Sequence, residues 1–315
     1  MVKIVGTTSV RVPVIVDKNF LNEYSKENGY FVDASHVLPF YIKSRFFFHY
    51  MRFVVGVLGS RDAADEKKFL NEVALYVKHN KLVDFIMAPH TSAVFKSFPD
   101  DAQFASFGSY VIDLTVSEEK LFKELHSKHR NVIRKAIKDG VVISNDPKYK
   151  DECILCVNET LKRQHVIGIS PSHAIWLKAN CSIDMYVAMY NGVVEGAGIF
   201  AWSDGLSSFY LYGGSKNGVH IGSLNLLQWT SILNMKKKGV KYYDFVGARI
   251  NPREGSKQEG IQRFKSRFGG TLQEGYIWKM SFNNFKTSIF YFLLWLRGVI
   301  SGGYSKDIID QENEK

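Results

Sequence analysis

The segment 183–282 constrains the fold most strongly, because its short alternating apolar runs are separated by strong turn signals. Asn191-Gly192 is a dipeptide typical of a tight hairpin turn, and a second turn follows at Ser203-Asp204-Gly205. Beside and between these turns, the pattern predicts three antiparallel strands at 184–190, 193–202 and 206–215. The segment therefore begins with a β-meander.

A helix and three further elements follow the meander. Apolar residues recur at helical spacing between Leu226 and Met235, and the run closes in lysines before Gly239, which is a helix stop. Beyond it the pattern predicts a strand at 241–246, a loop at 247–255, a helix at 259–268 and a strand at 271–282. This order of elements is that of the GNAT acyltransferase core, which makes a mixed sheet with helices on its faces.

The first half of the chain repeats this plan more loosely. Segments 40–42 and 50–58 are predicted to pair as strands, a helix follows at 65–79, and a strand follows at 83–88. The sequence VDFIMA of that strand echoes YDFVGA at 243–248, and each comes after an amphipathic helix that ends in lysines. Such an echo is what an internal duplication would leave, although six residues also match by chance.

These patterns predict an α/β chain, with a mixed α+β sheet, built from two GNAT-like acyltransferase halves in tandem. The residues between the halves favour one long basic helix or a helix pair that ends at Asp139-Gly140. We expect a first GNAT-like half at 1–116, a connecting basic helical segment at 117–140, a second, catalytic half at 141–283, and a C-terminal apolar helix with an acidic tail at 284–315.

The net charge narrows the range of partners. The chain has 41 lysines and arginines against 31 aspartates and glutamates, a formal net charge of +10, so its partners are expected to be anionic. Candidates are RNA such as tRNA, phosphorylated lipid carriers, nucleotide-linked sugars and anionic membrane surfaces, and a generic basic surface that aids solubility is the alternative.

Cysteine use and the N-terminal pattern indicate a compartment. No segment before Lys43 has the pattern of a signal peptide, and three cysteines without a framework spacing fit a reducing, cytoplasmic setting. Cys153 and Cys156 form a CxxC, but it lies in a predicted helix, and no second CxxC or histidine pair completes a zinc site. We therefore expect a buried structural pair and no metal.

Five short motifs follow one another between residues 87 and 282. They are VIDL at 111–114 together with KHRNVIRKA at 128–136, YGGS at 212–215, NLLQW at 225–229, YDFVG at 243–247 and FKSRFG at 264–269. Each motif alone is weak, but in this order they resemble the Fem family of peptidoglycan-bridge aminoacyltransferases, within the GNAT superfamily. Two departures bear on the substrate. The chain has no long charged heptad insertion of the kind that some members use for tRNA, and Asn225 or Leu224 stands where a pocket tyrosine is expected.

The resemblance implies an acyltransferase that has no bound cofactor and uses aminoacyl-tRNA or acyl-CoA as its donor substrate. The acceptor would be an amine of a cell-envelope precursor, either a peptidoglycan stem peptide or an amino sugar of an envelope polysaccharide, carried on an anionic small molecule or a lipid. Two alternatives are an acyl-CoA-dependent N-acyltransferase of a nucleotide-linked amino sugar, and a non-catalytic relative that binds tRNA or lipid.

Two residues are the predicted catalytic groups. In acyl transfer an amine attacks an ester or thioester carbonyl, and a positioned lysine strongly stabilises the negative charge that grows on the oxygen. The resemblance places the family's transition-state lysine at Lys265, whereas spacing alone favours a solvated surface lysine. Asp244, at the end of a strand, is a candidate acceptor for the proton of the amine, or a residue that caps a loop.

The resemblance also implies substrate contacts. Arg163 falls where the family's substrate-phosphate arginine lies, and its fork suits pyrophosphate; at a helix C-terminus it would equally stabilise the helix dipole. Tyr212 and Tyr243 are pocket candidates or core residues. Gln228 and Phe264 complete the predicted substrate contacts through the motifs that contain them.

A loop at 213–223 is the candidate site for the donor phosphates. It lies between a predicted strand and a helix N-terminus, where GNAT enzymes hold the coenzyme A pyrophosphate with backbone N–H groups. Gly218, Gly222 and Ser223 are the predicted contacts. The usual glycine signature is incomplete in this loop, so a flexible connection is the alternative.

An apolar segment near the C-terminus, 288–300, is shorter than the roughly 20 residues that a membrane span requires, and Arg297 interrupts it. With Lys279, Lys286 and Lys306 nearby, it suits a helix that lies on the inner face of the membrane. A helix that docks onto the body of the protein is the alternative, so both a peripheral membrane location and a purely cytoplasmic one stay open.

Overall fold

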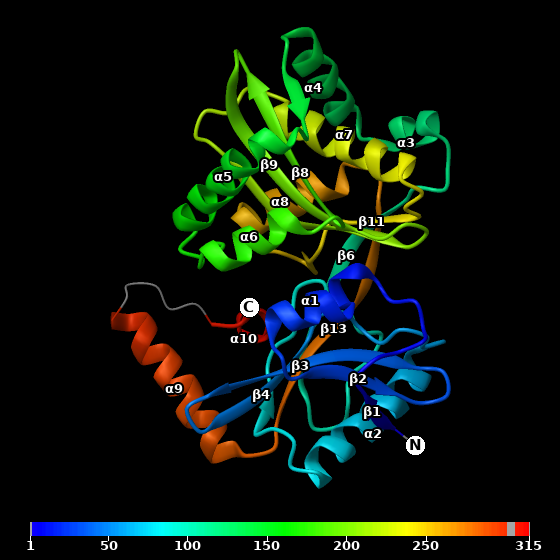
Figure 1. The fold of residues 1–315 in the computed structure, drawn as a ribbon, viewed down its shortest axis with the longest axis vertical. Coiled ribbons are helices and arrows are strands. Elements are labelled where there is room, and N and C mark those ends of the chain that lie inside the picture. Colours follow the sequence, from blue (N-terminus) through cyan, green and yellow to red (C-terminus); the bar gives the residue numbers. More distant parts are fainter. Residues whose placement is uncertain (1, 301–305, 315) are drawn as a thin grey trace. The chain divides into compact units, whose positions relative to one another are not determined.

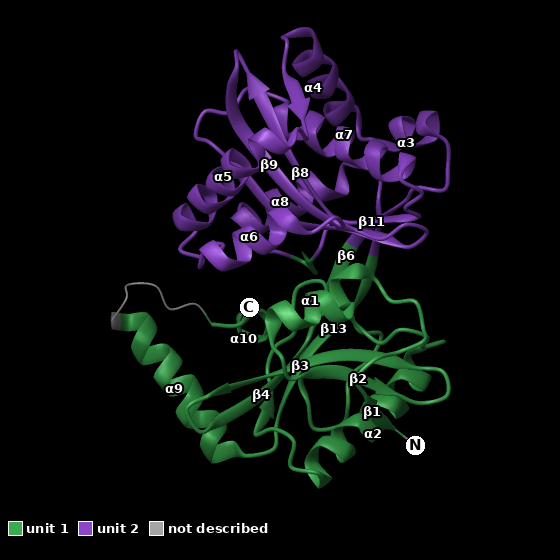
Figure 2. Cartoon of the chain, in the orientation of Figure 1, with its two compact units in different colours: residues 1–109, 247–251, 273–315 green, residues 110–246, 252–272 purple. Residues whose placement is uncertain are grey.

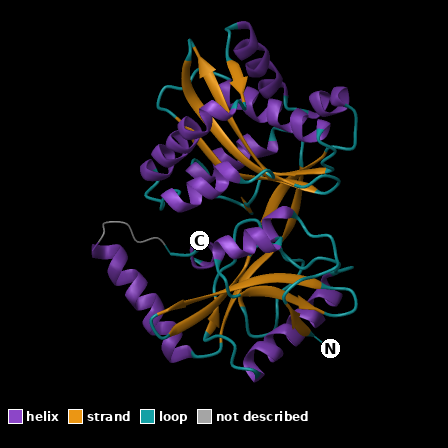
Figure 3. Ribbon diagram, in the orientation of Figure 1, coloured by secondary structure: helices purple, strands orange, loops and turns teal. Residues whose placement is uncertain are grey.

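The computed structural model describes residues 2–300 and 306–314 (Figure 1). The chain divides into two compact units, which Figure 2 colours separately. Unit 1 comprises Met1–Ser109, Gly247–Asn251 and Gln273–Lys315, and unit 2 comprises Tyr110–Val246 and Pro252–Leu272. Each unit combines β-strands with helices, as Figure 3 shows.

In unit 1 the strands lie side by side in the order β1-β2-β3-β4-β5-β13. Neighbouring strands are antiparallel except β4 and β5, which are parallel. The short strand β12 pairs with Phe107 and Gly108 of β6. The bounds are β1 Lys3–Val5, β2 Asn28–Val32, β3 Val37–Arg45, β4 Phe48–Phe53, β5 Phe85–Ile86, β6 Gln103–Asp113, β12 Ala248–Arg249, β13 Thr271–Ser281, α1 Lys18–Tyr24, α2 Ala63–His79, α9 Asn284–Ile300 and α10 Ile308–Asn313.

Helix α2 supplies much of the unit 1 core. Asp62 caps its start, because the Asp62 carboxylate accepts hydrogen bonds from the backbone N–H groups of Ala64 and Asp65. Its apolar residues recur at helical spacing and are buried, namely Phe69, Leu70, Val73 and Val77. They pack in one cluster with aromatic side chains of the sheet and a neighbouring loop, including Phe53, Phe95 and Trp278. The amphipathic pattern of α2 thus explains where this core lies.

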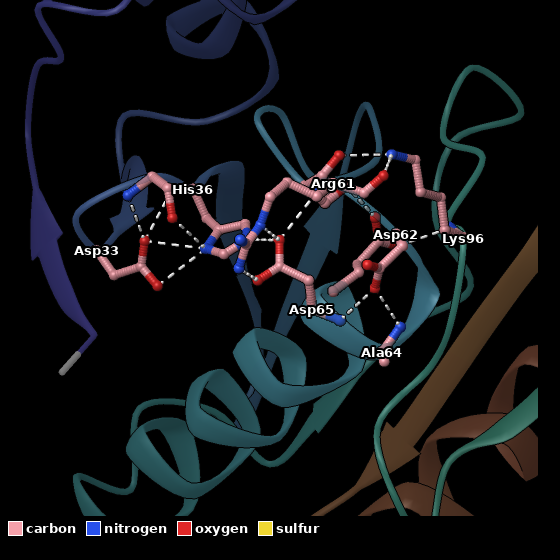
Figure 4. A network of polar contacts seen from close by, with 10 residues as sticks. Asp33, His36, Arg61, Asp62, Ala64, Asp65 and Lys96 are labelled. Carbon is pink, nitrogen blue, oxygen red and sulfur yellow. Dashed lines mark hydrogen bonds and ion pairs between the residues drawn. The ribbon is translucent and has the colours of Figure 1, made fainter.

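A polar network fastens the turn between β2 and β3 to the start of α2 (Figure 4). The His36 side chain is buried; its Nδ1 lies 2.9 Å from Asp33 Oδ2, and its Nε2 lies 3.0 Å from Asp65 Oδ2. Arg61 also pairs with Asp65, at 3.1 Å. Burial by itself lowers the pKa of His36, but the hydrogen bonds and charges of Asp33 and Asp65 outweigh it and raise the pKa above its ordinary value.

This raised pKa predicts a pH-dependent stability. A histidine that binds its proton more tightly when folded stabilises the fold fully below its unfolded pKa, and this contribution disappears as pH rises through the folded pKa. The melting temperature of His36→Gln should therefore fall below that of the wild type by about 2 °C or more at pH 5.5, and by less at pH 8.5. Thermal unfolding across this range tests the prediction. A difference that does not change with pH would contradict it.

In unit 2 the strands lie in the order β6-β11-β10-β9-β8-β7. The neighbours β10 and β11 are parallel, and the other pairs are antiparallel. The bounds are β7 Val142–Ser144, β8 Ile183–Tyr190, β9 Val193–Trp202, β10 Ser207–Ser215, β11 Tyr242–Asp244, α3 Glu118–Glu124, α4 Ser127–Lys138, α5 Lys150–Arg163, α6 Pro171–Ala179, α7 Ser223–Lys237 and α8 Lys257–Ser266.

The β-meander predicted from the sequence is confirmed. Strand β9 has the predicted bounds, and Asn191 and Gly192 form the turn before it with φ values of 51° and 75°. The basic segment between the halves is a helix pair, α3 and α4. Helix α6 was not predicted, although Ser170 at its N-cap and Pro171 at its first position are a start signal in the sequence.

The echo between 83–88 and 243–248 has a structural counterpart. Strand β5 follows α2 and pairs in parallel with β4, and β11 follows α7 and pairs in parallel with β10. Each unit therefore contains an antiparallel meander, a helix and a parallel strand in the same order, which is the plan that internal duplication predicts.

The bounds of the two units differ from the domain bounds expected from the sequence. Strand β13 was expected in the second half, but its residues from Gln273 onward belong to unit 1, where Met280 pairs with Ile86 of β5. The C-terminal helix α10 belongs to unit 1 as well, because Ile309 packs with Phe107 and Ile277. The helices α3 and α4 form part of unit 2 and not a separate connection, since Ile133 and the other apolar residues of these helices enter its core.

Cys153 and Cys156 are buried on α5, as predicted. Burial raises the pKa of the Cys153 thiol to about 12 and that of Cys156 to about 11, so both stay protonated near neutral pH and are poor nucleophiles. Within the ranges 2–300 and 306–314, no group of three or more histidine, cysteine or acidic side chains is arranged to hold a metal ion.

Candidate active site

Two parallel strands of unit 2, β10 and β11, separate next to the predicted catalytic residue Asp244. β10 and β11 pair only from Ser207 opposite Tyr242 to Phe209 opposite Asp244. β10 continues to Ser215 along β9, and its register with β9 shifts between Tyr210 and Tyr212, which marks a β-bulge. A β-bulge changes the direction of side chains and interrupts strand pairing, and bulges are frequent next to active sites.

The chain turns sharply where β11 ends. Val246 has a φ of 56°, in the left-handed region that β-branched residues rarely adopt, and Gly247 follows with a φ of 77°. The Asp244 carboxylate accepts a hydrogen bond of 2.7 Å from the Val246 N–H. This contact favours the loop-capping alternative for Asp244, because the carboxylate stabilises a backbone conformation that is otherwise strained.

Lys265 lies against this turn. Lys265 lies in the last turn of α8 and is 9% exposed. Its Nζ donates a hydrogen bond of 2.6 Å to the carbonyl oxygen of Val246. Burial lowers the pKa of Lys265 to about 8, and the Asp244 carboxylate partly offsets that effect. The alternative that Lys265 is a solvated surface lysine is therefore excluded. Its side chain is a buried ammonium group whose lowered pKa makes it lose its proton more readily than an exposed lysine does.

Helix α8 is fixed at both ends, which fixes Lys265. At its start the Ser256 hydroxyl accepts a hydrogen bond from the Glu259 N–H, and the Glu259 carboxylate accepts one from the N–H of Gly255, just before the N-cap. At its end Gly269 has a φ of 82°, and a side chain there would meet the backbone of Glu124 at 2.8 Å. The glycine of the FKSRFG motif thus allows close contact between the end of α8 and the end of α3.

Tyr243 and Gln228 lie in the core of unit 2. Both are almost fully buried, and the Tyr243 hydroxyl donates a hydrogen bond to the Gln228 side-chain carbonyl. Ser231 adds a contact of 3.3 Å to the same hydroxyl. This placement favours the core alternative for Tyr243, and it removes Gln228 from any surface that a substrate could reach in this structure.

Tyr212 and Phe264 are half-buried. The Tyr212 hydroxyl lies 3.4 Å from His173 Nε2 of α6, and the two rings meet edge to face. Phe264 packs against the core cluster and against the ring of His129. Of the predicted substrate residues, these two and Arg163 have side chains with exposed surface.

Arg163 links the end of α5 to the end of β10. Its guanidinium donates to the carbonyl oxygen of Ser215 and, over 2.9 Å, to the Thr160 hydroxyl. Thr160 accepts a further hydrogen bond from the Ser215 N–H, at 2.9 Å. Arg163 is exposed and stands in the last turn of the helix, so both the phosphate and the helix-dipole alternatives are compatible with its position.

A carboxylate from a neighbouring strand is hydrogen-bonded to the loop that was predicted to bind donor phosphates. Glu195 of β9 accepts hydrogen bonds from the Ser223 hydroxyl and from the His220 N–H. His220 also contacts Asp139 at 2.8 Å. Gly222 has a φ of 91°, and a side chain there would meet the Val132 carbonyl at 2.2 Å, so helix packing explains this glycine.

This arrangement favours the structural alternative for the loop. A phosphate near Gly222 and Ser223 would face two carboxylates, which is electrostatically unfavourable. Gly218 is exposed, with a φ of 72° and open space around its Cα. The sequence carried no signal that Glu195 would occupy this helix N-terminus, because the residue lies on a distant strand.

The structure thus brings together Lys265, Asp244 and Val246 at the point where β10 and β11 part. The loop with the predicted donor-phosphate residues packs instead on Glu195 and Asp139. The role of Val246, whose backbone carbonyl accepts the hydrogen bond from Lys265, was not predicted from the sequence. An aspartate two residues before a glycine-containing turn was the only available hint.

The fold and this arrangement define a mixed α/β protein of tandem GNAT-like architecture with a buried lysine at a strand end. No protein-family model and no curated protein sequence matches the chain. Among solved structures, the chain is similar to the crystal structure of FemX, with a TM-score of 0.62 and 13% sequence identity over 88% of this chain and 94% of that one.

Two other structures are also similar. One is the C-terminal domain of a putative lysylphosphatidylglycerol synthetase from Agrobacterium fabrum, with a TM-score of 0.54 and 12% identity over 84% of this chain and 87% of that one. The other is L-PGS from Bacillus licheniformis, with a TM-score of 0.52 and 10% identity over 82% and 85%. The likeness to a Fem-type protein that the motifs predicted is therefore confirmed at the level of the fold.

Proposed function

We propose that this chain is an acyltransferase that transfers an aminoacyl group to an amine of a cell-envelope precursor. The observation that carries the proposal is Lys265, a buried ammonium group held by the Val246 carbonyl where two parallel strands separate. A charged donor is costly to bury, so a fold retains one mainly where it is used or fully paired.

In the proposed reaction the lone pair of the acceptor amine attacks the carbonyl carbon of the donor ester or thioester. The carbonyl electrons move to its oxygen, and the Lys265 ammonium stabilises that oxyanion by a charge-assisted hydrogen bond. When the carbonyl re-forms, the bond to the donor oxygen or sulfur breaks. The amine gives up one proton and the leaving group gains one, so the reaction is balanced without a cofactor.

Asp244 is proposed in a positioning role. Its carboxylate holds the Val246 turn, which in turn holds Lys265. It also lies close enough to raise the pKa of Lys265 against the effect of burial. Both effects keep the ammonium form populated at neutral pH, which the proposed oxyanion role requires.

The proposed donor is aminoacyl-tRNA, and the proposed acceptor is an anionic or lipid-linked envelope precursor. The net charge of +10 suits both. One fold neighbour is named as a putative lysylphosphatidylglycerol synthetase, a name that joins an amino acid to a membrane lipid. Arg163, exposed at the end of α5, is the proposed contact for a phosphate of either substrate.

A donor-depletion assay tests this proposal. Purified protein is incubated with an envelope-precursor extract, radiolabelled amino acids, total tRNA and the enzymes that charge it. We expect label on the precursor, and we expect RNase treatment of the donor mixture to abolish it. Label transfer that survives RNase and requires acyl-CoA would contradict the proposed donor. Absence of transfer from both donors would contradict the proposed activity.

A further inference from the structure

The C-terminal helix α9 is apolar on two opposite faces, and within residues 2–300 and 306–314 only one of them is packed. Its inner face docks on unit 1 through Phe290, which is buried against the rings of Phe48 and Phe85. The opposite face follows helical spacing and is exposed, namely Phe285, Phe292, Trp295, Leu296 and Val299. An exposed apolar face of this size usually marks a site of interaction.

The tip of the hairpin between β3 and β4 is a second exposed apolar feature of unit 1. Two phenylalanines form the turn, Phe46 and Phe47, and their side chains are 86% and 55% exposed. Phe46 has a φ of 55°, a conformation in which asparagine or glycine is usual and a bulky residue is strained. Strain at an exposed aromatic residue favours a functional reason for it over a folding one.

The hairpin tip lies beside the side of α9 that carries Phe290 and Arg297, which are seven residues apart and therefore on one side of the helix. Phe46 and Phe48 line a crevice of about 160 Å³ together with Phe290, Leu293 and Leu294 of the helix. Figure 1 shows α9 beside this end of the strands. Arg45 and Arg297 complete the lining, and no acidic residue takes part in it.

The two arginines are the available cations of this surface. Among the described residues, neither Arg45 nor Arg297 forms an ion pair with an acidic side chain. The three lysines expected from the sequence to lie near the apolar segment with Arg297 are paired: Lys279 with Asp307 and Asp310, Lys286 with Asp84, and Lys306 with Glu314.

We propose that the hairpin tip and the outer face of α9 bind the surface of an anionic lipid bilayer. Aromatic and aliphatic side chains would enter the interface, and Arg45 and Arg297 would meet the phosphate groups. A second copy of this chain is a poorer occupant, because each copy carries a net charge of +10 and like charges oppose association. No helix in the described ranges is long and apolar enough to cross a bilayer.

Vesicle co-sedimentation of the full chain tests this inference, using phosphatidylcholine vesicles with and without about one third phosphatidylglycerol. We expect binding that increases with phosphatidylglycerol and weakens with salt. The double variant Phe292→Ser/Trp295→Ser should lower the partition coefficient about tenfold or more. Arg45→Glu/Arg297→Glu should remove the preference for anionic vesicles. All four side chains are exposed, so the melting temperatures should stay near that of the wild type.

Matched controls lie on α2 of the same unit. Leu75→Ser removes an isolated apolar side chain that is 65% exposed, and Lys68→Glu reverses an exposed charge; both should bind vesicles as the wild type does. The proposal is overturned if the wild type ignores anionic vesicles or if both double variants bind as well as it does. It is also overturned if sedimentation shows a dimer that Phe292→Ser/Trp295→Ser dissolves. Because no acyl donor is needed, a failure here is distinguishable from a failure of the proposed activity.

Discussion

Replacing Lys265 by methionine is expected to lower kcat by about 100-fold or more, the usual cost of losing one donor to an oxyanion. Methionine keeps the length of the side chain but removes its charge. The cost in stability should be small, because one buried hydrogen bond to the Val246 carbonyl is lost while an unfavourable buried charge is removed as well. The measurement is steady-state kinetics in the donor assay, together with thermal unfolding.

A matched control is Lys257→Met, since Lys257 lies at the start of the same helix and is exposed; its kcat should be unchanged. The pH profile is a second readout. With a pKa of about 8, Lys265 is mostly protonated at pH 7 and loses its proton as pH rises through about 8. Wild-type activity should therefore decline above that pH, and the residual activity of Lys265→Met should lack this decline. A well-folded methionine variant with a normal kcat would exclude the proposed role.

Replacing Trp278 by alanine is expected to destabilise unit 1 by about 3–5 kcal/mol, the range for removing a large aromatic side chain from a core. Trp278 is fully buried, and its ring centroid lies 5.3 Å from that of Phe53 and 5.5 Å from that of Phe95. Because a chain of two units need not unfold in one step, hydrogen exchange is the appropriate measurement. Protection should fall in α2 and β3 and stay unchanged in β8 and β9.

Trp278→Phe is the control for this substitution. The Trp278 indole N–H has no hydrogen-bond partner among the described residues, so phenylalanine removes an unsatisfied donor while it keeps most of the apolar volume. Its cost should be well below that of alanine. Loss of protection in β8 and β9 in place of α2 and β3 would restore the boundary expected from the sequence, which put Trp278 in the second half.

Local patterns in the sequence were sufficient for most elements of unit 2. The turn at Asn191-Gly192 and the helix stop at Gly239 work through the backbone freedom of a few adjacent residues, so the sequence alone reveals them. The same reasoning found α2 through its apolar periodicity. Strand β5 is shorter than predicted. Its bounds are set by pairing with the neighbouring strands, whereas the prediction used only the composition of the segment itself.

The candidate site was only partly predictable. The motif FKSRFG identified Lys265 as a residue of interest, but its spacing could not show that the side chain is buried. That depends on the Val246 turn and on the packing of α8 against segments far away in the chain. Gln228 and Glu195 illustrate the same limit: one polar side chain lies in the core, and the other occupies a helix start, through contacts with residues from other elements.

By itself, the sequence determined the class of fold, the meander, the main helices and the tandem plan, since each follows from periodicity and turn chemistry over a few residues. Only the tertiary structure decided that β13 and α10 complete unit 1, that the lysine is buried with a pKa of about 8, and that α9 packs one apolar face and exposes the other. These features depend on contacts between segments that are far apart in the sequence. Such contacts set burial and strand pairing, and local propensity has little influence on them.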